Sequence, residues 1–159
     1  MAIREVRQMG DPVLSKVCKE VKEMNERTQI LIEDMFDTRY EANGVGLAAP
    51  QVGILKRIVV IDTTGEDPIL LINPRIVETD GEQTGNEGCL SVPGKSGIVT
   101  RPDYVKVVAQ NENMETVEFE GTELLARAFC HEIEHLDGHL YVEKVEGELM
   151  DTVNYEDEE

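Results

Sequence analysis

The spacing of hydrophobic positions changes along the chain, and these changes predict the order of its elements. Between residues 26 and 42, apolar residues recur three and four positions apart, as they do in an amphipathic helix. The stripe combines the pair Leu31 and Met35 with a neighbouring row, Ile32, Phe36 and Tyr40. Asn25 is a typical N-cap, and the Asn-Gly pair at 43–44 is expected to end the helix.

Strand patterns fill the middle of the chain. Five runs are either β-branched throughout or alternate between apolar and polar residues, which is the period of a strand. They span residues 57–62, 69–74, 98–101, 105–109 and 116–120. Residues 78–87 are polar and contain glycine, which predicts a loop or a hairpin.

A second helix is predicted from about residue 123 to 137, with Thr122 as its N-cap and Gly138 as its terminator. Its expected core face consists of Leu125, Phe129, Ile133 and Leu136. A short strand at 140–142 and a weakly structured tail should follow. Because helices and strands do not alternate regularly, we predict an α+β domain: mostly antiparallel sheets packed around a central C-terminal helix, with an N-terminal helix.

Length and charge narrow the class of protein. The 159 residues contain no repeat, which predicts one catalytic domain over 1–150 and an acidic, flexible tail over 151–159. A net charge of −18 argues against direct nucleic-acid binding, which needs a basic surface. No apolar run approaches the ~20 residues of a membrane span, and the charged start lacks a signal peptide, so we expect a cytoplasmic protein without membrane contact.

The residues that suggest chemistry lie in the second helix, as His131-Glu132-Ile133-Glu134-His135. Two histidines four positions apart share one helical face, so both imidazoles can reach a single metal ion. Glu132 follows His131 and can handle the proton of a water on that metal. The pattern also arises by chance, so it needs a third ligand and a substrate site to be convincing.

The sequence offers several candidates for a third ligand. In the best-known enzymes with this pattern the ligand lies downstream, but Tyr141 stands where a third histidine would be expected. His139 lies just past the helix-ending glycine and is a weak candidate. Cys89 upstream is better, because a thiolate is a strong ligand for Zn or Fe(II). Its spacing alone leaves two interpretations open, a metal ligand or a buried free thiol. The other two cysteines, Cys18 and Cys130, are expected to be structural.

The segment from Gly44 to Gln51 fits neither a helix nor a regular strand. The two glycines that flank Val45 indicate either a close approach to the backbone or a positive φ angle. A buried turn is the simpler explanation when this segment is considered alone.

Three motifs in this order closely resemble the peptide deformylases of bacteria. They are Gly44-Val45-Gly46-Leu47-Ala48-Ala49-Pro50-Gln51, Glu87-Gly88-Cys89-Leu90-Ser91 and His131-Glu132-Ile133-Glu134-His135. The resemblance covers essentially the whole chain except the tail. It implies a hydrolase that removes the formyl group from the N-terminal formyl-methionine of newly synthesised polypeptides and releases formate.

The resemblance also implies how the site is built. Cys89, His131 and His135 would hold the metal, which would be Fe2+, with Zn2+, Ni2+ or Co2+ able to substitute. Glu132 would be the general base and acid for a metal-bound water that attacks the formyl carbon.

The remaining implied roles concern the substrate. Gln51 and the backbone N–H of Leu90 would donate hydrogen bonds to the developing oxyanion. Gly46 would contact the substrate backbone, and Val45 would help to wall the methionine pocket. The peptide could then lie along this segment as an added strand.

Two residues beside the ligands depart from the family pattern. Cys130 stands where glutamine is frequent, and Glu134 stands where aspartate is usual. Both can alter hydrogen bonds around the ligands without removing a ligand. The acidic end also lacks the long basic helix that some members use on the ribosome, so only a transient ribosome contact is expected.

Two other functions compete with this interpretation. One is a conventional peptidase that cleaves internal peptide bonds, and an unformylated protein substrate would distinguish it. The other is a non-enzymatic module with a structural metal, which would need a fourth protein ligand and would leave Glu132 without a task.

Overall fold

The computed structural model of the chain describes residues 2–151. Its helices are α1 (Glu26–Glu41) and α2 (Glu123–Leu136), with short 3-10 helices η1 (Pro12–Ser15), η2 (Ala49–Val52) and η3 (Tyr141–Lys144). Its strands are β1 (Gly46–Ala48), β2 (Ile58–Ile61), β3 (Ile69–Asp80), β4 (Gln83–Cys89), β5 (Val92–Arg101), β6 (Tyr104–Gln110), β7 (Thr116–Thr122) and β8 (Glu146–Asp151).

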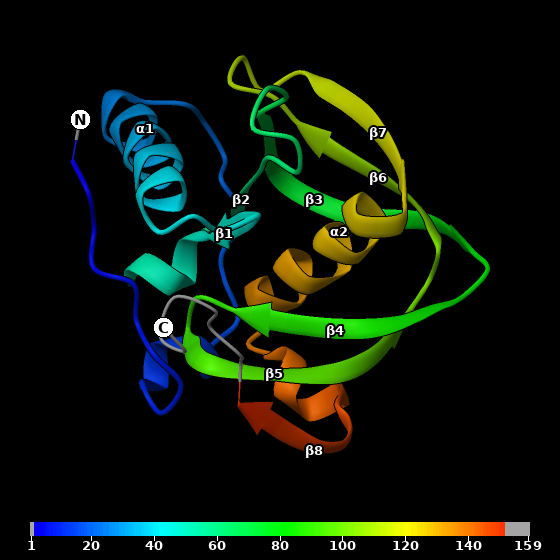
Figure 1. The fold of residues 1–159 in the computed structure, drawn as a ribbon. Coiled ribbons are helices and arrows are strands. Elements are labelled where there is room, and N and C mark those ends of the chain that lie inside the picture. Colours follow the sequence, from blue (N-terminus) through cyan, green and yellow to red (C-terminus); the bar gives the residue numbers. More distant parts are fainter. Residues whose placement is uncertain (1, 152–159) are drawn as a thin grey trace.

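The strands form two antiparallel sheets, with α2 between them (Figure 1). One sheet has the order β1-β2-β3-β6-β7, and the other has the order β4-β5-β8. The tight turn between β3 and β4 passes the chain from the first sheet to the second. The prediction of a loop or hairpin at 78–87 is therefore wrong, because these residues form the end of β3 and most of β4, and these two strands do not pair with each other. This arrangement confirms the predicted α+β class with antiparallel sheets around the late helix.

Strand β2 is buried on both faces, which explains its unbroken β-branched sequence. Ile58 and Val60 pack in a cluster with residues of α1, whereas Val59 and Ile61 pack in a cluster with residues of α2. All four side chains are fully buried. The five-stranded sheet is therefore covered by one helix on each side, and α2 is fixed between this sheet and the β4-β5-β8 sheet.

Helix α2 buries the face that its sequence predicts. Phe129 and Leu136 are fully buried, and Gly138 has the left-handed φ of 83° that ends the helix. Thr122 occupies the N-cap position as predicted, but its side chain makes no capping hydrogen bond, and β7 runs directly into the helix. The bounds and the core face of α2 place its two histidines toward the interior.

The apolar stripe of α1 is shorter than predicted. Asn25 caps the helix as expected, and Leu31, Ile32 and Met35 are buried. Tyr40, however, is 75% exposed. Each step of four residues turns about 40° around a helix of 3.6 residues per turn, so the row that starts at Ile32 rotates out of the core before it reaches Tyr40.

The C-terminal part of the described chain differs from the prediction. The apolar run 140–142 is not a strand, because Tyr141 begins the 3-10 helix η3 and the Glu143 carboxylate accepts from the Leu140 N–H at 2.8 Å. Residues 146–151 are also not a loose tail, since they form β8 and pair with β5. The rest of the predicted tail, 152–159, lies outside the described residues.

Two further features bear on the site. No helix within residues 2–151 is long and apolar enough to cross a membrane. Strand β1 is an edge strand of its sheet, and β4 is an edge strand of the other sheet. Both edges line the same cavity, which contains the predicted site.

Candidate active site

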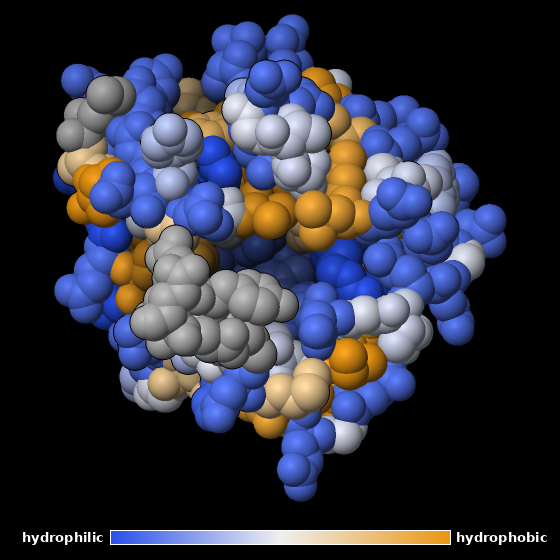
Figure 2. Space-filling model, viewed as in Figure 1, coloured by the Kyte–Doolittle hydropathy of each residue, from blue (hydrophilic) through white to orange (hydrophobic). Residues whose placement is uncertain are grey.

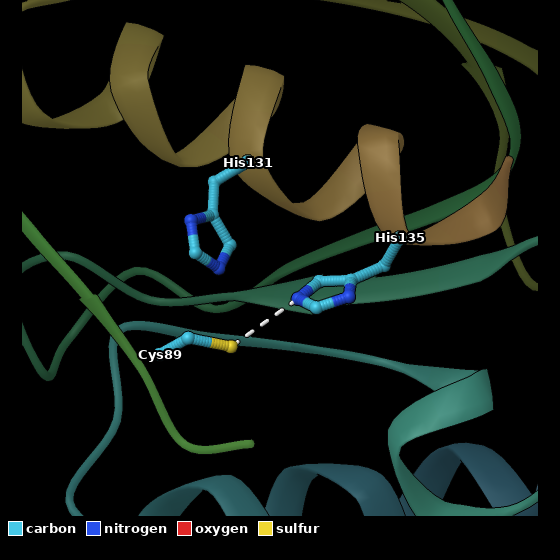
Figure 3. A group of neighbouring side chains, drawn as sticks. All are labelled: Cys89, His131 and His135. Carbon is cyan, nitrogen blue, oxygen red and sulfur yellow. Dashed lines mark hydrogen bonds between the residues drawn. The ribbon is translucent and has the colours of Figure 1, made fainter. Parts of the chain in front are cut away.

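The two histidines of α2 point from one helical face toward the same point (Figure 3). His131 is 7% exposed and His135 is 1% exposed, and their ring centroids lie 5.0 Å apart. The spacing of four residues therefore produces the convergence that it predicted. Tyr141, which is also buried, stacks on the His131 ring at 5.8 Å and limits its rotation.

Cys89 reaches these histidines from the end of β4. The β4–β5 pairing shifts register between Glu87 and Cys89, and this irregularity turns the thiol toward α2. Its Sγ lies 3.4 Å from His135 Nε2. One ligand atom from each of Cys89, His131 and His135 lies within 4.8 Å of the others.

This group fits a divalent metal ion by the chemistry of its donors. One thiol and two imidazoles suit Zn or Fe(II), and three protein ligands leave a position open for catalysis. His131 Nδ1 is occupied by a 2.5 Å hydrogen bond to Glu87 Oε1, so its Nε2 remains available to a metal. Burial lowers the pKa of His135 and keeps its ring neutral, as ligation requires.

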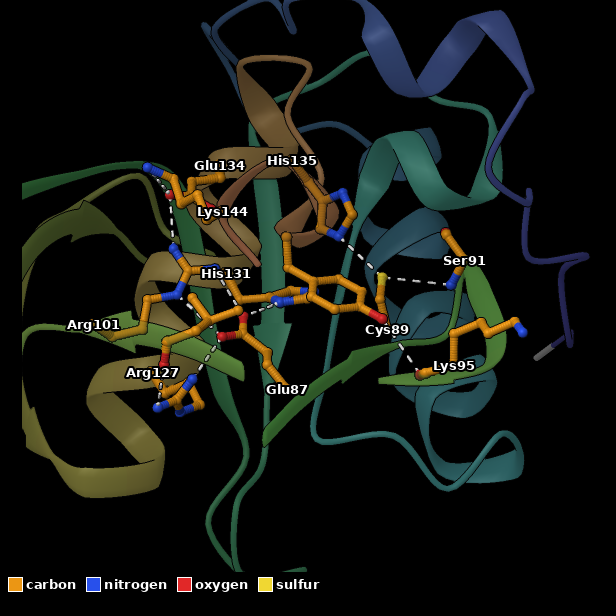
Figure 4. A network of polar contacts seen from close by, with 12 residues as sticks. Glu87, Cys89, Ser91, Lys95, Arg101, Arg127, His131, Glu134, His135 and Lys144 are labelled. Atoms are coloured by element: carbon orange, nitrogen blue, oxygen red, sulfur yellow. Dashed lines mark hydrogen bonds and ion pairs between the residues drawn. The ribbon is translucent and has the colours of Figure 1, made fainter. Parts of the chain in front are cut away.

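Glu87 anchors a buried ionic network behind the metal group (Figure 4). Its carboxylate accepts hydrogen bonds from Arg101 Nη2, Arg127 Nη1 and His131 Nδ1, at 2.8, 2.8 and 2.5 Å. Burial alone would raise the pKa of Glu87, but the bonds from His131 and Arg101 lower it to about 2. Glu87 is therefore an anion that fixes the tautomer and orientation of His131.

The sequence did not assign roles to Glu87, Arg101 or Arg127. The only signal was that each is a charged residue next to a motif or a strand end, and many surface residues share that property. Glu134 joins the network through a 2.8 Å bond from Arg101 Nη1 and a 3.4 Å contact from Lys144 Nζ. Glu134 departs from the family pattern, but it lies outside the ligand group. Its side chain is connected to that of His131 through Arg101 and Glu87.

The other sequence candidates for metal binding do not join the group. His139 is exposed and pairs with Glu143. Cys18 and Cys130, which were expected to be structural, are buried free thiols outside the group, and burial raises the pKa of both to about 11.

Glu132 lies beside the group formed by Cys89, His131 and His135, and its carboxylate is buried. It is 6% exposed, and its Oε1 has no hydrogen-bond partner among the described residues. Burial raises the pKa of Glu132 to about 7. A carboxylate with a pKa near neutrality can both accept and return a proton.

Gln51 connects the Gly-rich segment to the cysteine. It is 1% exposed, its Oε1 accepts from the Ala48 N–H at 2.9 Å, and its Nε2 donates to Ser91 Oγ at 3.0 Å. The same Nε2 lies 3.5 Å from Cys89 Sγ. The amide is therefore held next to the metal group, and the contact with Ser91 was not predicted.

A cavity of about 420 Å3 opens over this group, and Figure 2 shows a hollow on this face with apolar residues along its rim. The sequence-predicted residues that line it are Val45, Gly46, Gln51, Cys89, Leu90, His131 and Glu132. His135 lies behind them as the buried third ligand candidate. The structure thus brings all eight predicted site residues together.

The Gly-rich segment approaches its neighbours closely, and neither glycine beside Val45 has a positive φ. A Cβ at Gly46 would lie 2.8 Å from Glu132 Oε2. Residues 46–51 form β1 and most of η2, and only residues 44–45 form the turn that leads into β1. The prediction of close approach is therefore correct, and a simple buried turn does not describe the segment.

A helix with the His-Glu-x-x-His pattern, a cysteine from an adjacent strand and a cavity above them form a site that is typical of metal-binding hydrolases. Comparisons with known proteins specify the class further. The sequence profile of the family described as polypeptide deformylase matches residues 3–149. This chain belongs to that family and is an enzyme.

Individual relatives agree with this assignment. A peptide deformylase of Agathobacter rectalis is 68% identical over 99% of this chain and 98% of its own length. A peptide deformylase of Lachnoclostridium phytofermentans is 62% identical over 100% of this chain and 99% of its own length. The crystal structure of a peptide deformylase from Legionella pneumophila is 44% identical, with a TM-score of 0.88 over 91% of this chain and 86% of that one. A structure from Synechococcus elongatus, solved in complex with actinonin, is 41% identical over 91% and 79% of the chains, with a TM-score of 0.87.

Proposed function

We propose that this enzyme hydrolyses the formyl group from the N-terminal formyl-methionine of nascent polypeptides and releases formate. The observation that carries the proposal is the convergence of Cys89, His131 and His135 beside the buried carboxylate of Glu132, at one wall of the cavity. Three ligands suit a catalytic site, whereas a purely structural metal would call for a fourth.

Cys89, His131 and His135 would hold the metal ion, which we propose to be Fe2+, with Zn2+, Ni2+ or Co2+ able to substitute. When bound, such an ion supplies an activated water and polarises the carbonyl of the substrate. Glu87 supports this role because it holds His131 Nδ1 and directs Nε2 toward the ligand group.

Glu132 is the proposed general base and general acid. Its carboxylate takes a proton from the attacking water as the new C–O bond forms to the formyl carbon. It then delivers that proton to the methionine nitrogen as the C–N bond breaks, which leaves formate and a free amine. Gln51 Nε2 and the Leu90 N–H are the proposed donors to the oxyanion that forms between these steps.

Strand β1 is the proposed docking edge for the peptide. The Asp62 N–H donates to the Val45 carbonyl at 2.8 Å, so residue 62, just after β2, lies opposite residue 45 and continues the register in which Gly46 lies opposite Ile61. In an antiparallel ladder hydrogen-bonded and non-hydrogen-bonded pairs alternate, and therefore the N–H and C=O of Gly46 face away from β2. These two groups can bind the substrate backbone by strand addition, whatever its side chains are.

The methionine side chain needs an apolar wall next to the reacting bond. Val45, Leu90 and Leu124 line the cavity and are the proposed wall, and Leu124 is 48% exposed. We also propose that actinonin, present in the Synechococcus elongatus relative, competes with formyl peptides for this cavity. The partners are then formyl-methionyl nascent chains met in the cytoplasm, with transient ribosome contact and no binding to membranes or nucleic acid.

Formate release from formyl-Met-Ala-Ser tests this function. The metal-loaded enzyme should release formate and should not cleave an unformylated protein. Glu132→Gln should lower kcat by at least about 10²-fold and leave the metal content unchanged. Full activity in Glu132→Gln would rule out this base, and cleavage of the unformylated protein would favour a peptidase.

A further inference from the structure

The turn that joins α1 to β1 must be placed accurately, because the cavity depends on it at two points. A Cβ at Gly44 would lie 2.7 Å from Leu90 Cδ1, and one at Gly46 would lie 2.8 Å from Glu132 Oε2. Gly44 therefore packs against a proposed oxyanion residue, and Gly46 packs against the proposed base. The turn therefore fixes where the β1 edge lies between these two side chains.

Arg39, in the last turn of α1, holds this segment directly. Its Nη1 donates to the Gly44 carbonyl at 2.9 Å, while the Gly44 N–H donates to the Arg39 carbonyl at 3.0 Å. The Arg39 side chain is only 11% exposed. Because these two bonds satisfy both backbone groups of Gly44, this residue is tied to the helix end rather than left as a loose hinge.

Asp62, just after β2, contacts both Arg39 and the turn that Arg39 holds. Its N–H binds the Val45 carbonyl at 2.8 Å, and its Oδ2 lies 3.9 Å from Arg39 Nη2. Its Oδ1 also accepts from the Gly65 N–H at 2.7 Å, which anchors the carboxylate. The buried charge of Arg39 is thereby compensated next to the carbonyl that it binds.

The side-chain bonds leave one part of β1 free for a ligand. The Gly44 carbonyl is taken by Arg39, and the Ala48 N–H is taken by Gln51 Oε1 at 2.9 Å. Neither group of Gly46 has such a side-chain partner among the described residues. The backbone groups of Gly44 and the N–H of Ala48, on either side of Gly46, are thus satisfied within the protein.

From this geometry we propose that Arg39 is a positioning residue for peptide binding. With Asp62, it holds Gly44 to Gly46 in the conformation that presents Gly46 to the backbone of the substrate. The proposal rests on the function proposed above, since it assumes that the peptide lies along β1. Arg39 touches neither the substrate nor the reacting atoms, so its effect should fall on KM.

The test compares two arginines that each form an ion pair with an aspartate. Arg39→Met removes the guanidinium and keeps most of the apolar stem. Arg4→Met is the matched control, because it removes the 2.9 Å pair between Arg4 and Asp34 of α1, away from the cavity lining. Both variants are measured with formyl-Met-Ala-Ser and with formyl-methionine amide, per equivalent of bound metal, alongside thermal unfolding.

For Arg39→Met we expect KM for the tripeptide to rise about ten-fold, the scale of losing one hydrogen bond, while kcat changes less than about two-fold. The rise should be several-fold smaller for formyl-methionine amide, because this substrate has less backbone to pair along β1. Arg39→Lys, which keeps a donor and a charge, should recover part of the lost affinity. Arg4→Met should lower the unfolding midpoint without changing either KM.

Three outcomes would overturn the proposal. They are an unchanged KM in Arg39→Met, an equal change for both substrates, and the same KM rise in Arg4→Met. Each is distinct from failure of the proposed function, in which the unmodified enzyme would release no formate from either substrate.

Discussion

Gly46 of β1 and Glu132 of α2 are packed so closely that a Cβ on Gly46 would lie 2.8 Å from Glu132 Oε2 and 2.9 Å from its Cγ. Real Cβ atoms do not tolerate such contacts with fixed atoms, so the carboxylate would have to move. We expect Gly46→Ala to lower kcat/KM by about 10²-fold, the scale of a 1 Å misplacement of a catalytic group. Formate release from a formyl tripeptide measures this loss.

The matched control is Gly85→Ala in β4. A Cβ there would meet only Arg127 Nη2, at 3.7 Å, which is ordinary contact. This variant should keep its activity within about two-fold, and both variants should retain their metal. Equal activity of Gly46→Ala and the parent enzyme would show that Glu132 does not need its present position.

Cys89 and Cys130 allow a direct test of the proposed ligand group. Cys89 supplies its sulfur to the group, whereas Cys130 is a buried thiol next to His131 in the helix. After anaerobic purification, Cys89→Ala should contain less than about a tenth of the metal of the parent, because two imidazoles bind a divalent ion weakly. Cys130→Ala should keep its metal and lose only stability. Full metal content in Cys89→Ala would require another third ligand.

The parts of this molecule that follow from local periodicity could be predicted from sequence. The stripe of α2 and the two-sided burial of β2 depend on residues a few positions apart, and the convergence of His131 and His135 depends on the same spacing. The wrong prediction of a strand at 140–142 also has a local cause. The apolar run is typical of a strand, but the Leu140 N–H binds the Glu143 carboxylate and the residues form a 3-10 helix.

The ionic network could not be predicted, because its contacts join residues far apart in the chain. Glu87 meets Arg101, Arg127 and His131 across 14, 40 and 44 positions. No local pattern marks these partners, and isolated charged residues usually lie at the surface. The role of Cys89 could not be predicted from local spacing either. Only the order of the three motifs distinguished a metal ligand from a buried thiol.

Removal of Glu87 should weaken metal binding even though Glu87 is not a ligand. In Glu87→Ala, His131 loses the acceptor that fixes its ring, so we expect metal affinity to fall by about 10–100-fold. The buried side chains of Arg101 and Arg127 would also lose their carboxylate, at a cost of about 3–5 kcal/mol in unfolding free energy. Competition with a chelator measures the affinity, and urea unfolding measures the stability.

Glu87→Gln separates these two effects. Its amide oxygen can still accept from His131 Nδ1, but the negative charge that pairs with the arginines is gone. Metal affinity should therefore recover more than stability does. Recovery of stability alone would contradict the role of Glu87 in orienting His131.

Asp62 should make the stability of the fold depend on pH. Burial alone would raise the pKa of Asp62, but the N–H groups of Gly65, Asp67 and Thr64, together with Arg39, lower it. A lowered pKa stabilises the folded state at pH values above the unfolded pKa of about 3.9, and this contribution is lost as pH falls through the folded value. Asp62→Asn should therefore lower the free energy of unfolding by about 1–2 kcal/mol at pH 7, and this difference from the parent should shrink below about pH 4.

Urea unfolding of both proteins between pH 7 and pH 3.5 measures this difference, and Asp67→Asn, at an exposed position, is the control. A difference that stays constant over this range would show that the Asp62 charge does not contribute to folding.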